Sequence, residues 1–415
     1  MKRGILILFV LLVYSGIPYA QEIYQWRGVD RKGVYPEIPM VSFLEEEPEQ
    51  VLAIAGFGNG YGAPVVTPEG IFVTGEIGDT ALVFRYSLSG ELIWQTPFGK
   101  DWVATYPGSR SSPTIVGDLL YVCSGLGNLA CLEVATGECV WIIDTIHGQP
   151  LMHGHAESPL VFDDMVYLVA GGRDTNIVAF DRFQGTVKWI AEGRGERAGY
   201  NAPNLIRLPE RDILVTFSAY HLLGLDARTG ELLWTHEQTN IPIEKRKPGA
   251  GDTHSNTIYF DEGFIYYFAG DGNGAVKLRL SPNGDSITQV WRNESIDNFM
   301  GGVVRIGSYL YSTTMSGRDL RSLSVETGLE SDTLKLGSGA LIATGNNLIY
   351  YSQKGQLNLV RADQGKMSPD GAFQIHFGTK EHFSHPVIFN GILYLRRGDA
   401  LRGWKIRKHA PDVGF

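Results

Sequence analysis

The sequence predicts an all-β fold, an eight-bladed β-propeller of four-stranded antiparallel blades whose ring is closed by an N-terminal strand. Three observations predict it. A phrase of short apolar runs ending in Trp recurs along the chain, with 45 to 57 residues between successive Trp positions. Gly and Pro are abundant, 51 and 19 of 415 residues, and separate the apolar runs as turn formers do. No amphipathic helix of three turns lies between them.

The repeated unit has a fixed order of parts. It begins with Ser or Asn before Pro, continues through short apolar strands joined by Gly or Asp turns, and ends in a Gly turn that leads to Trp. The clearest copy runs from Ser112 to Trp141. Similar copies occupy 63–99, 157–193, 201–238 and 254–293, degenerate copies 300–337 and 339–378, and an incomplete copy 384–408. A period of about 45 residues with four strands is typical of a propeller blade.

The repeated Trp has a structural explanation. In four of five copies it lies four residues after the turn Gly, as in Gly137 and Trp141, and in the fifth the hairpin between Gly284 and Trp291 is longer. An indole on the outermost strand is large enough to fill the wedge between twisted blades. We therefore expect these Trp side chains to pack between blades rather than to stack on a ligand.

The last unit lacks its fourth strand, and the N-terminal part of the chain offers a replacement. Val51–Ile54 lies where the outer strand of a preceding blade would be, so its pairing with 384–408 would close the ring and remove an exposed sheet edge. The predicted organisation is a signal peptide (1–20), an N-terminal arm (21–50), one propeller (51–408) and a C-terminal tail (409–415).

Charge and the first residues narrow the class of protein. The chain has 36 Lys and Arg against 45 Asp and Glu, a net charge of −9, which argues against a nucleic-acid partner. Lys2 and Arg3 precede the apolar run Ile5–Val13, and small residues follow up to Ala20, as in a secretory signal. No Cys follows that run, so we expect no lipid anchor. The sequence predicts export to the periplasm or the outside, with no transmembrane segment.

Three cysteines, Cys123, Cys131 and Cys139, recur at intervals of eight residues within one unit. The spacing matches no zinc motif. One residue on each of three neighbouring strands is explained by three small buried apolar side chains. A Cys123–Cys131 cross-strand disulfide is the alternative, and it would leave Cys139 unpaired.

Several phrases resemble a known family, the exported bacterial PQQ-like (quinoprotein dehydrogenase-like) β-propeller repeat proteins. The repeated Asp/Glu-x-x-Thr-Gly-x-x-x-Trp is one of them. The others are Trp26-Arg27-Gly28, Arg31-Lys32-Gly33-Val34, Ala156-Glu157-Ser158-Pro159-Leu160, Asp297-Asn298-x-Met300-Gly301-Gly302-Val303 and His385-Pro386-Val387-Ile388. The resemblance covers nearly all of the mature chain and implies eight blades. It leaves the activity open, because such proteins include quinone-dependent alcohol dehydrogenases and non-enzymatic scaffolds.

The resemblance raises the question of a cofactor. Dehydrogenases of this kind hold PQQ with an aromatic plane, a disulfide between adjacent cysteines, Arg or Lys on its carboxylates, and a calcium ion with oxygen ligands. This sequence has no two adjacent cysteines and no Cys-x-x-Cys-His for a haem. We expect no cofactor, with PQQ and calcium as the alternative.

Candidate functional residues lie in the connections that lead from one blade to the next. In a propeller these loops surround the axial funnel on one face. The candidates are Trp102, Arg110, His155, Glu157, Tyr200, Asn201, His254, Asn256, Asn298, His382 and His385. Three interpretations are open: the side chains satisfy backbone groups in tight loops, they form a ligand site, or His153 and His155 bind a metal.

The geometry of the repeat predicts where a site would lie. Arg110, His155, Glu157, His254 and His385 each precede an inner strand by a few residues, so they should converge on one pocket at the axis. We therefore expect a non-enzymatic, monomeric binding protein that takes a small molecule, a carbohydrate or an envelope protein at its funnel face. The alternatives are a PQQ-dependent alcohol dehydrogenase and an envelope assembly scaffold.

Overall fold

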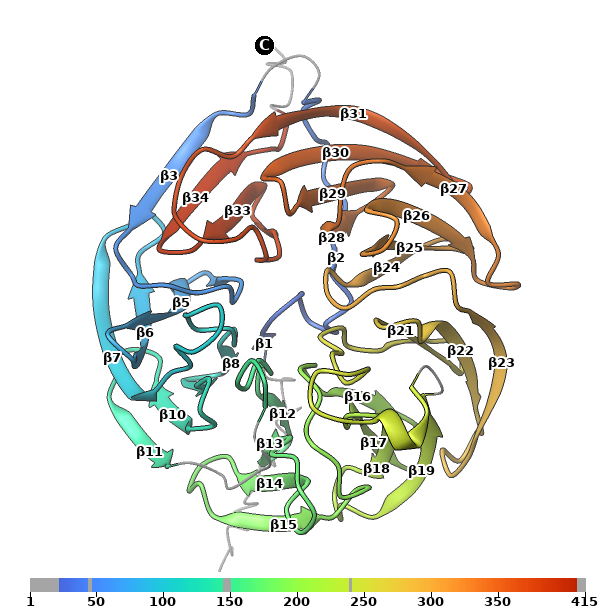
Figure 1. The fold of residues 1–415 in the computed structure, drawn as a ribbon. Coiled ribbons are helices and arrows are strands. Elements are labelled where there is room, and N and C mark those ends of the chain that lie inside the picture. Colours follow the sequence, from blue (N-terminus) through green and yellow to red (C-terminus); the bar gives the residue numbers. More distant parts are fainter. Residues whose placement is uncertain (1–21, 44–46, 145–150, 239–240, 409–415) are drawn as a thin grey trace, which may run out of the picture.

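The strands form a closed ring of eight antiparallel sheets around a central axis (Figure 1). The computed structural model describes residues 22–43, 47–144, 151–238 and 241–408. The predicted signal peptide and the C-terminal tail lie outside the described residues. Within the described residues the one helical segment is a 3₁₀ turn at Ile243–Lys245, and no helix is long and apolar enough to cross a membrane.

The first four blades follow the chain from the inside outward. Blade 1 contains β4 (Val65–Thr67), β5 (Gly70–Ile77), β6 (Thr80–Tyr86) and β7 (Leu92–Lys100). Blade 2 contains β8 (Thr114–Val116), β9 (Leu119–Cys123), β10 (Leu129–Glu133) and β11 (Cys139–Ile143). Blade 3 contains β12 (Leu160–Phe162), β13 (Met165–Leu168), β14 (Ile177–Asp181) and β15 (Val187–Ala191). Blade 4 contains β16 (Asn204–Arg207), β17 (Asp212–Phe217), β18 (His221–Asp226) and β19 (Leu232–Glu237).

The remaining blades repeat this order up to the closing sheet. Blade 5 contains β20 (Tyr259–Asp261), β21 (Phe264–Ala269), β22 (Gly274–Leu280) and β23 (Ile287–Asn293). Blade 6 contains β24 (Val303–Ile306), β25 (Tyr309–Thr314), β26 (Asp319–Ser324) and β27 (Glu330–Leu334). Blade 7 contains β28 (Gly339–Thr344), β29 (Asn347–Ser352), β30 (Gln356–Asp363) and β31 (Lys366–Gln374). Blade 8 contains β32 (Val387–Phe389), β33 (Ile392–Arg397), β34 (Ala400–Lys405) and β3 (Gln50–Ala55).

Strand β3 confirms the predicted closure. It pairs antiparallel with β34, with Ala53 opposite Arg402 and Ala55 opposite Ala400. Leu52 and Ile54 are buried while their neighbours along the strand are exposed, the alternation expected of a strand with one covered face. The strand is one residue longer at each end than the predicted Val51–Ile54.

The repeated Trp side chains lie between blades, as predicted. Each indole N–H donates to a backbone carbonyl in the outer hairpin of the following blade, as Trp189 does to Ala227 at 3.3 Å. The other pairs are Trp94 with Val134, Trp141 with Arg182, Trp234 with Gly284 and Trp291 with Val325. The indole of Trp189 also covers Gly230 in that hairpin, where a Cβ would lie 2.5 Å from the ring. In this pair, the Trp of one blade packs on the turn Gly of the next blade.

The hydrophobic core is divided among the blade junctions. The described residues form eight buried clusters, and each cluster joins side chains of two neighbouring blades. Leu214 of blade 4, for example, packs in one cluster with Tyr167 of blade 3. Each sheet is therefore buried on both faces, which explains why its inner strands are almost continuously apolar.

The N-terminal arm crosses the centre of the ring before it becomes β3 (Figure 1). Its strand β1 (Ile23–Tyr24) pairs antiparallel with β8 of blade 2, and its strand β2 (Val34–Tyr35) pairs parallel with β28 of blade 7. Further along, Ile38 and Phe43 are buried in the cluster between blades 7 and 8. The arm therefore connects opposite sides of the ring through the axis.

The cysteine prediction is partly wrong. Cys123 on β9 and Cys131 on β10 are buried, as expected of small apolar side chains, and neither forms a disulfide. Cys139 is exposed on β11, the outermost strand of the blade. An outer strand faces solvent with its alternate side chains, so the third position of the series is not in the core.

Candidate functional site

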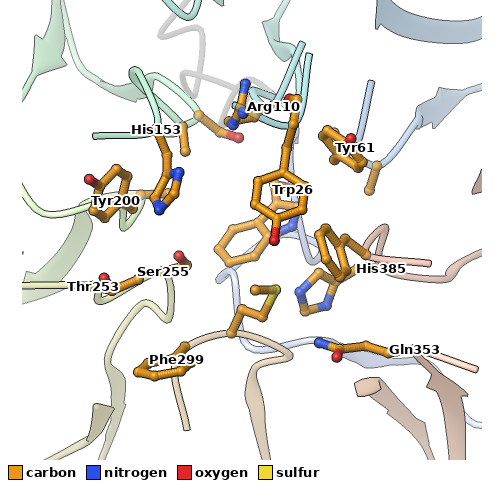
Figure 2. A pocket seen from close by; sticks show the side chains of 18 of the residues that line it. Trp26, Tyr61, Arg110, His153, Tyr200, Thr253, Ser255, Phe299, Gln353 and His385 are labelled. Atoms are coloured by element: carbon orange, nitrogen blue, oxygen red, sulfur yellow. Dashed lines mark hydrogen bonds between the residues drawn. The ribbon is translucent and has the colours of Figure 1, made fainter. Parts of the chain in front are cut away.

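A cavity of about 480 Å³ lies at the axis, where the loops between blades meet. Figure 2 shows it with Arg110 and Tyr61 along one wall, His153 and Tyr200 on a second, and His385 and Gln353 on the opposite one. It is lined by Trp26, Tyr61, Gly62, Ala63, Tyr106, Arg110, His153, Ala156, Ser158, Tyr200, Ala202, Thr253, Ser255, Phe299, Met300, Met315, Gln353, Phe383 and His385. Most of these residues belong to the segments that lead into inner strands, the region that the repeat predicted. The cavity is concave and largely aromatic, with a few polar groups, as ligand sites usually are.

Trp26 and Arg27 of the arm build part of this cavity. The ring of Trp26 meets His385 edge to face, with 5.2 Å between centroids. Arg27 lies behind His385, is 3% exposed, and commits every N–H of its guanidinium. The five acceptors are the carbonyl oxygens of Arg31, Lys32, Val303 and Leu341 and Nδ1 of His385, at 2.7 to 3.3 Å. The arm is therefore fastened to blades 6, 7 and 8 by one side chain.

Two glycines make room for that guanidinium. Gly33 and Gly302 both have positive φ, at 68° and 79°, and a Cβ on either would overlap the terminal nitrogens of Arg27. Only Gly combines this backbone conformation with such a close approach. The space that the guanidinium occupies explains why Gly is needed at both positions, which belong to two sequence motifs far apart in the chain.

Arg31 fastens the arm to the other side of the ring. It is 1% exposed and donates to the carbonyl oxygens of Ser158 (3.0 Å), Pro159 (2.6 Å) and Pro203 (3.1 Å) in blades 3 and 4. Its Nε donates to Gln25 at 2.8 Å. Ser158 also lines the cavity, so Arg31 lies directly behind the wall.

Arg110 and Arg396 complete a group of four arginines around the axis. Arg110 lines the cavity, donates to the carbonyl oxygens of its own loop, and lies over the ring of Tyr61 at 5.8 Å. Arg396 is fully buried and donates to the carbonyl of Gly62, another lining residue, at 3.1 Å. Each of the four arginines is thus in the cavity wall or one contact behind it.

The electrostatic character of the cavity follows from these four arginines. None of them forms an ion pair in the part of the chain that the structure describes, and no Asp or Glu is among the described lining residues. Burial lowers the pKa of Arg27 to about 10 and of Arg31 and Arg396 to about 9, so all stay charged at neutral pH. Asp101 and Glu157 act on them from further away, and burial raises the pKa of Glu157 well above its usual value. In a chain of net charge −9, the described cavity wall contains a basic side chain and no acidic one.

A chain of aromatic contacts runs along one side of the cavity. The ring of Phe383 lies 5.5 Å from Tyr61 and 5.9 Å from Tyr106, and His153 lies 6.0 Å from Tyr106 and 5.8 Å from Tyr200. These are ordinary distances for tilted aromatic pairs. The five rings come from five different loops and offer a flat apolar ligand an extended contact surface.

The structure brings some of the predicted site residues to the cavity. Arg110, Tyr200, His385 and the metal candidate His153 line it. Of the five residues expected at its centre, His155, Glu157 and His254 do not line it. The convergence on one pocket is therefore observed for two of the five, Arg110 and His385.

Four predicted residues lie behind the cavity and hold loops to strands. Glu157 accepts hydrogen bonds from the backbone N–H of Val169, and Asn201 accepts one from that of Phe217. Asn256 and Asn298 bond to backbone and hydroxyl groups of neighbouring segments, among them Phe268, Gly302 and Ser312. All four are buried, and each ties its loop to neighbouring structure, three of them reaching the second strand of their blade. Such contacts are those expected of side chains that satisfy backbone groups in tight loops.

Three of the other predicted residues have hydrogen-bond partners elsewhere in the loops and strands. His254 is buried, contacts the carbonyl oxygens of Ala219 and Gly251 through Nε2, and has a pKa lowered by burial to about 4. Trp102 donates to Thr105 at 3.0 Å. His382 contacts the hydroxyl of Tyr351, and burial lowers the pKa of both His382 and His155 to about 4.

The donor set of the described residues does not suit a metal or PQQ with calcium. No three His, Cys, Asp or Glu side chains among them are grouped closely enough to hold an ion. Calcium requires several hard oxygen ligands, and the cavity wall offers no carboxylate. His153 instead contacts the hydroxyl of Thr105 at 3.0 Å. We therefore derive no step through a metal or a quinone.

Several lining residues were not among the candidates chosen from the sequence. Trp26, Tyr61, Tyr106, Phe299 and Phe383 are the largest of them. Phe299 lies within the phrase that contains Met300, and Trp26 within the phrase that contains Arg27, so both were marked by the family resemblance. Tyr61 and Phe383 precede inner strands, the same position in the repeat that pointed to Arg110.

Comparisons with known proteins agree with the fold. A family model described as "Outer membrane protein assembly factor BamB" matches residues 79–333, more than half of the chain, and no curated protein matched. The solved structure of BamB from Moraxella catarrhalis has 14% sequence identity and a TM-score of 0.62, and the match covers 86% of this chain and 100% of that one. A europium-containing methanol dehydrogenase has 10% identity and a TM-score of 0.67, covering 90% and 89%. The chain belongs to the family of PQQ-like β-propellers that this model describes.

Proposed function

We propose that the protein is an exported, non-enzymatic binding protein that takes a small anionic ligand with a flat apolar body into its axial cavity. The observation that carries the proposal is the composition of the wall. Arg110 lies in it, three more arginines lie one contact behind it, and no described lining residue is acidic. A buried cation without a carboxylate partner gains most from an anion that reaches it, because little water competes there.

The shape of the wall supports the second half of the proposal. The five-ring series from Tyr61 to Tyr200 faces a cavity of about 480 Å³, within the size range of sites for small molecules. Aromatic side chains supply contact area at low entropic cost, and Arg110 over Tyr61 already shows how a cation sits on this surface.

A matched ligand pair tests the proposal. Naphthalene-2-carboxylate and 2-naphthylmethanol have the same ring and differ in charge. We expect the carboxylate to bind more tightly to the wild-type protein by a factor of roughly 10 to 100, as a charge-assisted hydrogen bond implies. In Arg110→Met this preference should fall while the alcohol binds as before, and Arg110→Lys should keep part of it. Isothermal titration calorimetry measures all three.

Two outcomes would overturn the proposal. One is equal binding of the two ligands by the wild-type protein, because the arginines would then not select charge. The other is dye-linked oxidation of a simple alcohol in the presence of PQQ and calcium, which would favour the dehydrogenase alternative. If Arg110→Met loses the alcohol as well, its loop has been disturbed, and Arg110→Lys then decides the comparison.

A second candidate function is a scaffold in envelope assembly. The family description favours it, and so do four exposed apolar side chains on the loops beside the cavity, Val103, Tyr106, Leu126 and Met152. A photo-crosslinking residue at Leu126 should capture a partner protein in the native cells if this function holds. The same residue at Leu329, an exposed position on an outer hairpin, is the control.

A further inference from the structure

We infer that His385 is the hydrogen-bond donor of the cavity: Arg27 fixes it as a neutral imidazole with its proton on Nε2, and this N–H donates to an acceptor atom of the ligand. The inference deepens the proposed function and rests on it for the identity of the acceptor. It assigns a binding role to His385 and a positioning role to Arg27.

The argument begins with the protons of Arg27. A guanidinium has five N–H groups and no acceptor. Four of them meet backbone carbonyl oxygens, and the fifth, on Nη1, meets Nδ1 of His385 at 3.0 Å. Since Arg27 can only donate, Nδ1 of His385 must accept. The proton of a neutral His385 is therefore on Nε2.

The second step concerns the charge of His385. The residue is 9% exposed, and Arg27 is the charged group in contact with its ring. Burial first, and the charge of Arg27 second, lower the pKa of His385 well below its usual value. Tyr35 and Tyr259 lie within electrostatic range of Arg27, and burial keeps both hydroxyls protonated by raising their pKa, that of Tyr259 to about 12. Among the described residues, no carboxylate acts on Arg27 or His385 to favour a second proton on the imidazole.

The third step places Nε2 at the cavity. His385 lines the cavity, and Figure 2 shows its ring on the wall opposite His153 and Tyr200. In the described part of the chain, Nε2 of His385 has no hydrogen-bond partner. This atom is also not fully covered by its surroundings. An accessible N–H at a ligand-sized cavity is available to an acceptor on the ligand.

The construction of the pair indicates that its geometry is fixed in advance. Gly33 and Gly302 leave the space in which the guanidinium lies, and the rings of His385 and Trp26 pack in a T-shaped arrangement. His385 is thus held on one side by a charged donor and on another by an aromatic ring, so little reorganisation is needed when a ligand arrives. A neutral donor also selects differently from Arg110, because it donates to uncharged carbonyl oxygens as well as to carboxylates.

The first part of the test is spectroscopic and needs no ligand. We expect ¹⁵N-histidine spectra of the full-length protein to show pyrrole-type Nε2 and pyridine-type Nδ1 for His385, unchanged between pH 7.5 and 5.5. The signal that disappears in His385→Gln provides the assignment. A proton on Nδ1, or an imidazolium within this range, would overturn the inference whatever binds. In Arg27→Lys we expect the tautomers to mix or the ring to titrate, a change that a purely structural role of Arg27 would not produce.

The second part uses naphthalene-2-carboxylate and naphthalene-2-carboxamide, which share a carbonyl acceptor. Gln can offer an N–H close to the place of Nε2, whereas Leu cannot. We expect His385→Gln to bind both probes within about threefold of wild type and His385→Leu to bind both at least tenfold more weakly, with Arg110 intact. Wild-type affinity in His385→Leu would remove the donor role and leave the proposed function standing. A wild-type protein that binds neither probe would overturn the proposed function and the donor role together.

Discussion

At the scale of single residues, the packing of blade 3 against blade 4 depends on a contact between Trp189 and Gly230. Gly230 has a φ of 77° and lies under the indole of Trp189, whose N–H reaches Ala227 in the same hairpin. The backbone conformation and the close approach both require Gly. Because the contact belongs to two blades, a single methyl group at this position acts on the packing between sheets rather than on one hairpin.

Two matched substitutions separate these requirements. Gly263→Ala is at a φ of 81° with nothing within 4 Å of the new Cβ, so it should cost about 1 kcal/mol through backbone strain alone. Gly230→Ala should cost about 1–3 kcal/mol more, because its Cβ would meet the indole at 2.5 Å. Denaturant unfolding of both variants measures the difference. Equal losses would show that the Trp189 contact is not needed. Trp189→Ala should cost less in the Gly230→Ala background than in the wild-type protein, because the clash is then relieved.

At the scale of elements, β3 closes the ring by taking the place of the missing outer strand. Leu52 and Ile54 lie over Gly90, the turn Gly of blade 1, at 3.1 and 3.3 Å from its Cβ position. At five other junctions a Trp side chain fills the space between the blades. At this junction two aliphatic side chains of the closing strand fill it. The closing strand also covers the outer edge of β34, which would otherwise present unpaired backbone groups to other chains.

Loss of the closing strand should expose that edge and open the first junction. Removal of residues up to Ile54 is expected to lower the melting temperature and to cause association of the protein in light-scattering chromatography. Because this truncation also removes the arm, Leu52→Ser tests β3 alone and should cost about 2 kcal/mol or more. Val51→Ser, at a 44% exposed position of the same strand, should cost less than about 0.5 kcal/mol. A truncated protein that melts like wild type and stays monodisperse would contradict the role of β3.

At the scale of the whole molecule, three histidines with lowered pKa values lie near the axis of the propeller. His254 and His155 have pKa values lowered by burial to about 4, and the pKa of His385 lies well below its usual value. All three are close to the loops that lead into inner strands. The native state therefore keeps them neutral at a pH where the unfolded chain would protonate them.

Stability should consequently fall with acidification in a defined range. Histidines with a lowered native pKa contribute stability that is present above about pH 6.5 and is lost as the pH falls from there towards about 4, because the unfolded chain binds the extra protons. Each fully buried histidine can account for up to roughly 2 kcal/mol at pH 5. His254→Gln keeps an N–H for the carbonyls of Ala219 and Gly251 and should flatten the pH dependence by about one proton. The free energy of unfolding is measured by denaturant unfolding at several values between pH 7 and 4.5. If its dependence on pH is the same in His254→Gln as in wild type, His254 is not one of these histidines.

The sequence by itself determined the repeat architecture. The spacing of Gly137 and Trp141 and its copies predicted four-stranded blades, and the missing strand of the last unit predicted the pairing of Val51–Ile54. These features are local and repeated, so each copy supports the others. Arg110, Tyr200 and His385 could be chosen because each precedes an inner strand by a few residues.

Only the tertiary structure decided which of those positions face the cavity. Glu157 and Asn201 also precede inner strands by a few residues, yet Glu157 accepts from Val169 just after β13 and Asn201 accepts from Phe217 on β17. The residues that follow them, Ser158 and Ala202, line the cavity instead. The contacts of the N-terminal arm were even harder to predict from the sequence. Arg27 meets Val303 and His385 at separations of 276 and 358 residues, and four of its five acceptors are backbone carbonyls. Since every residue type carries a carbonyl, such partners leave no side-chain pattern in the sequence, and only closure of the ring brings them together.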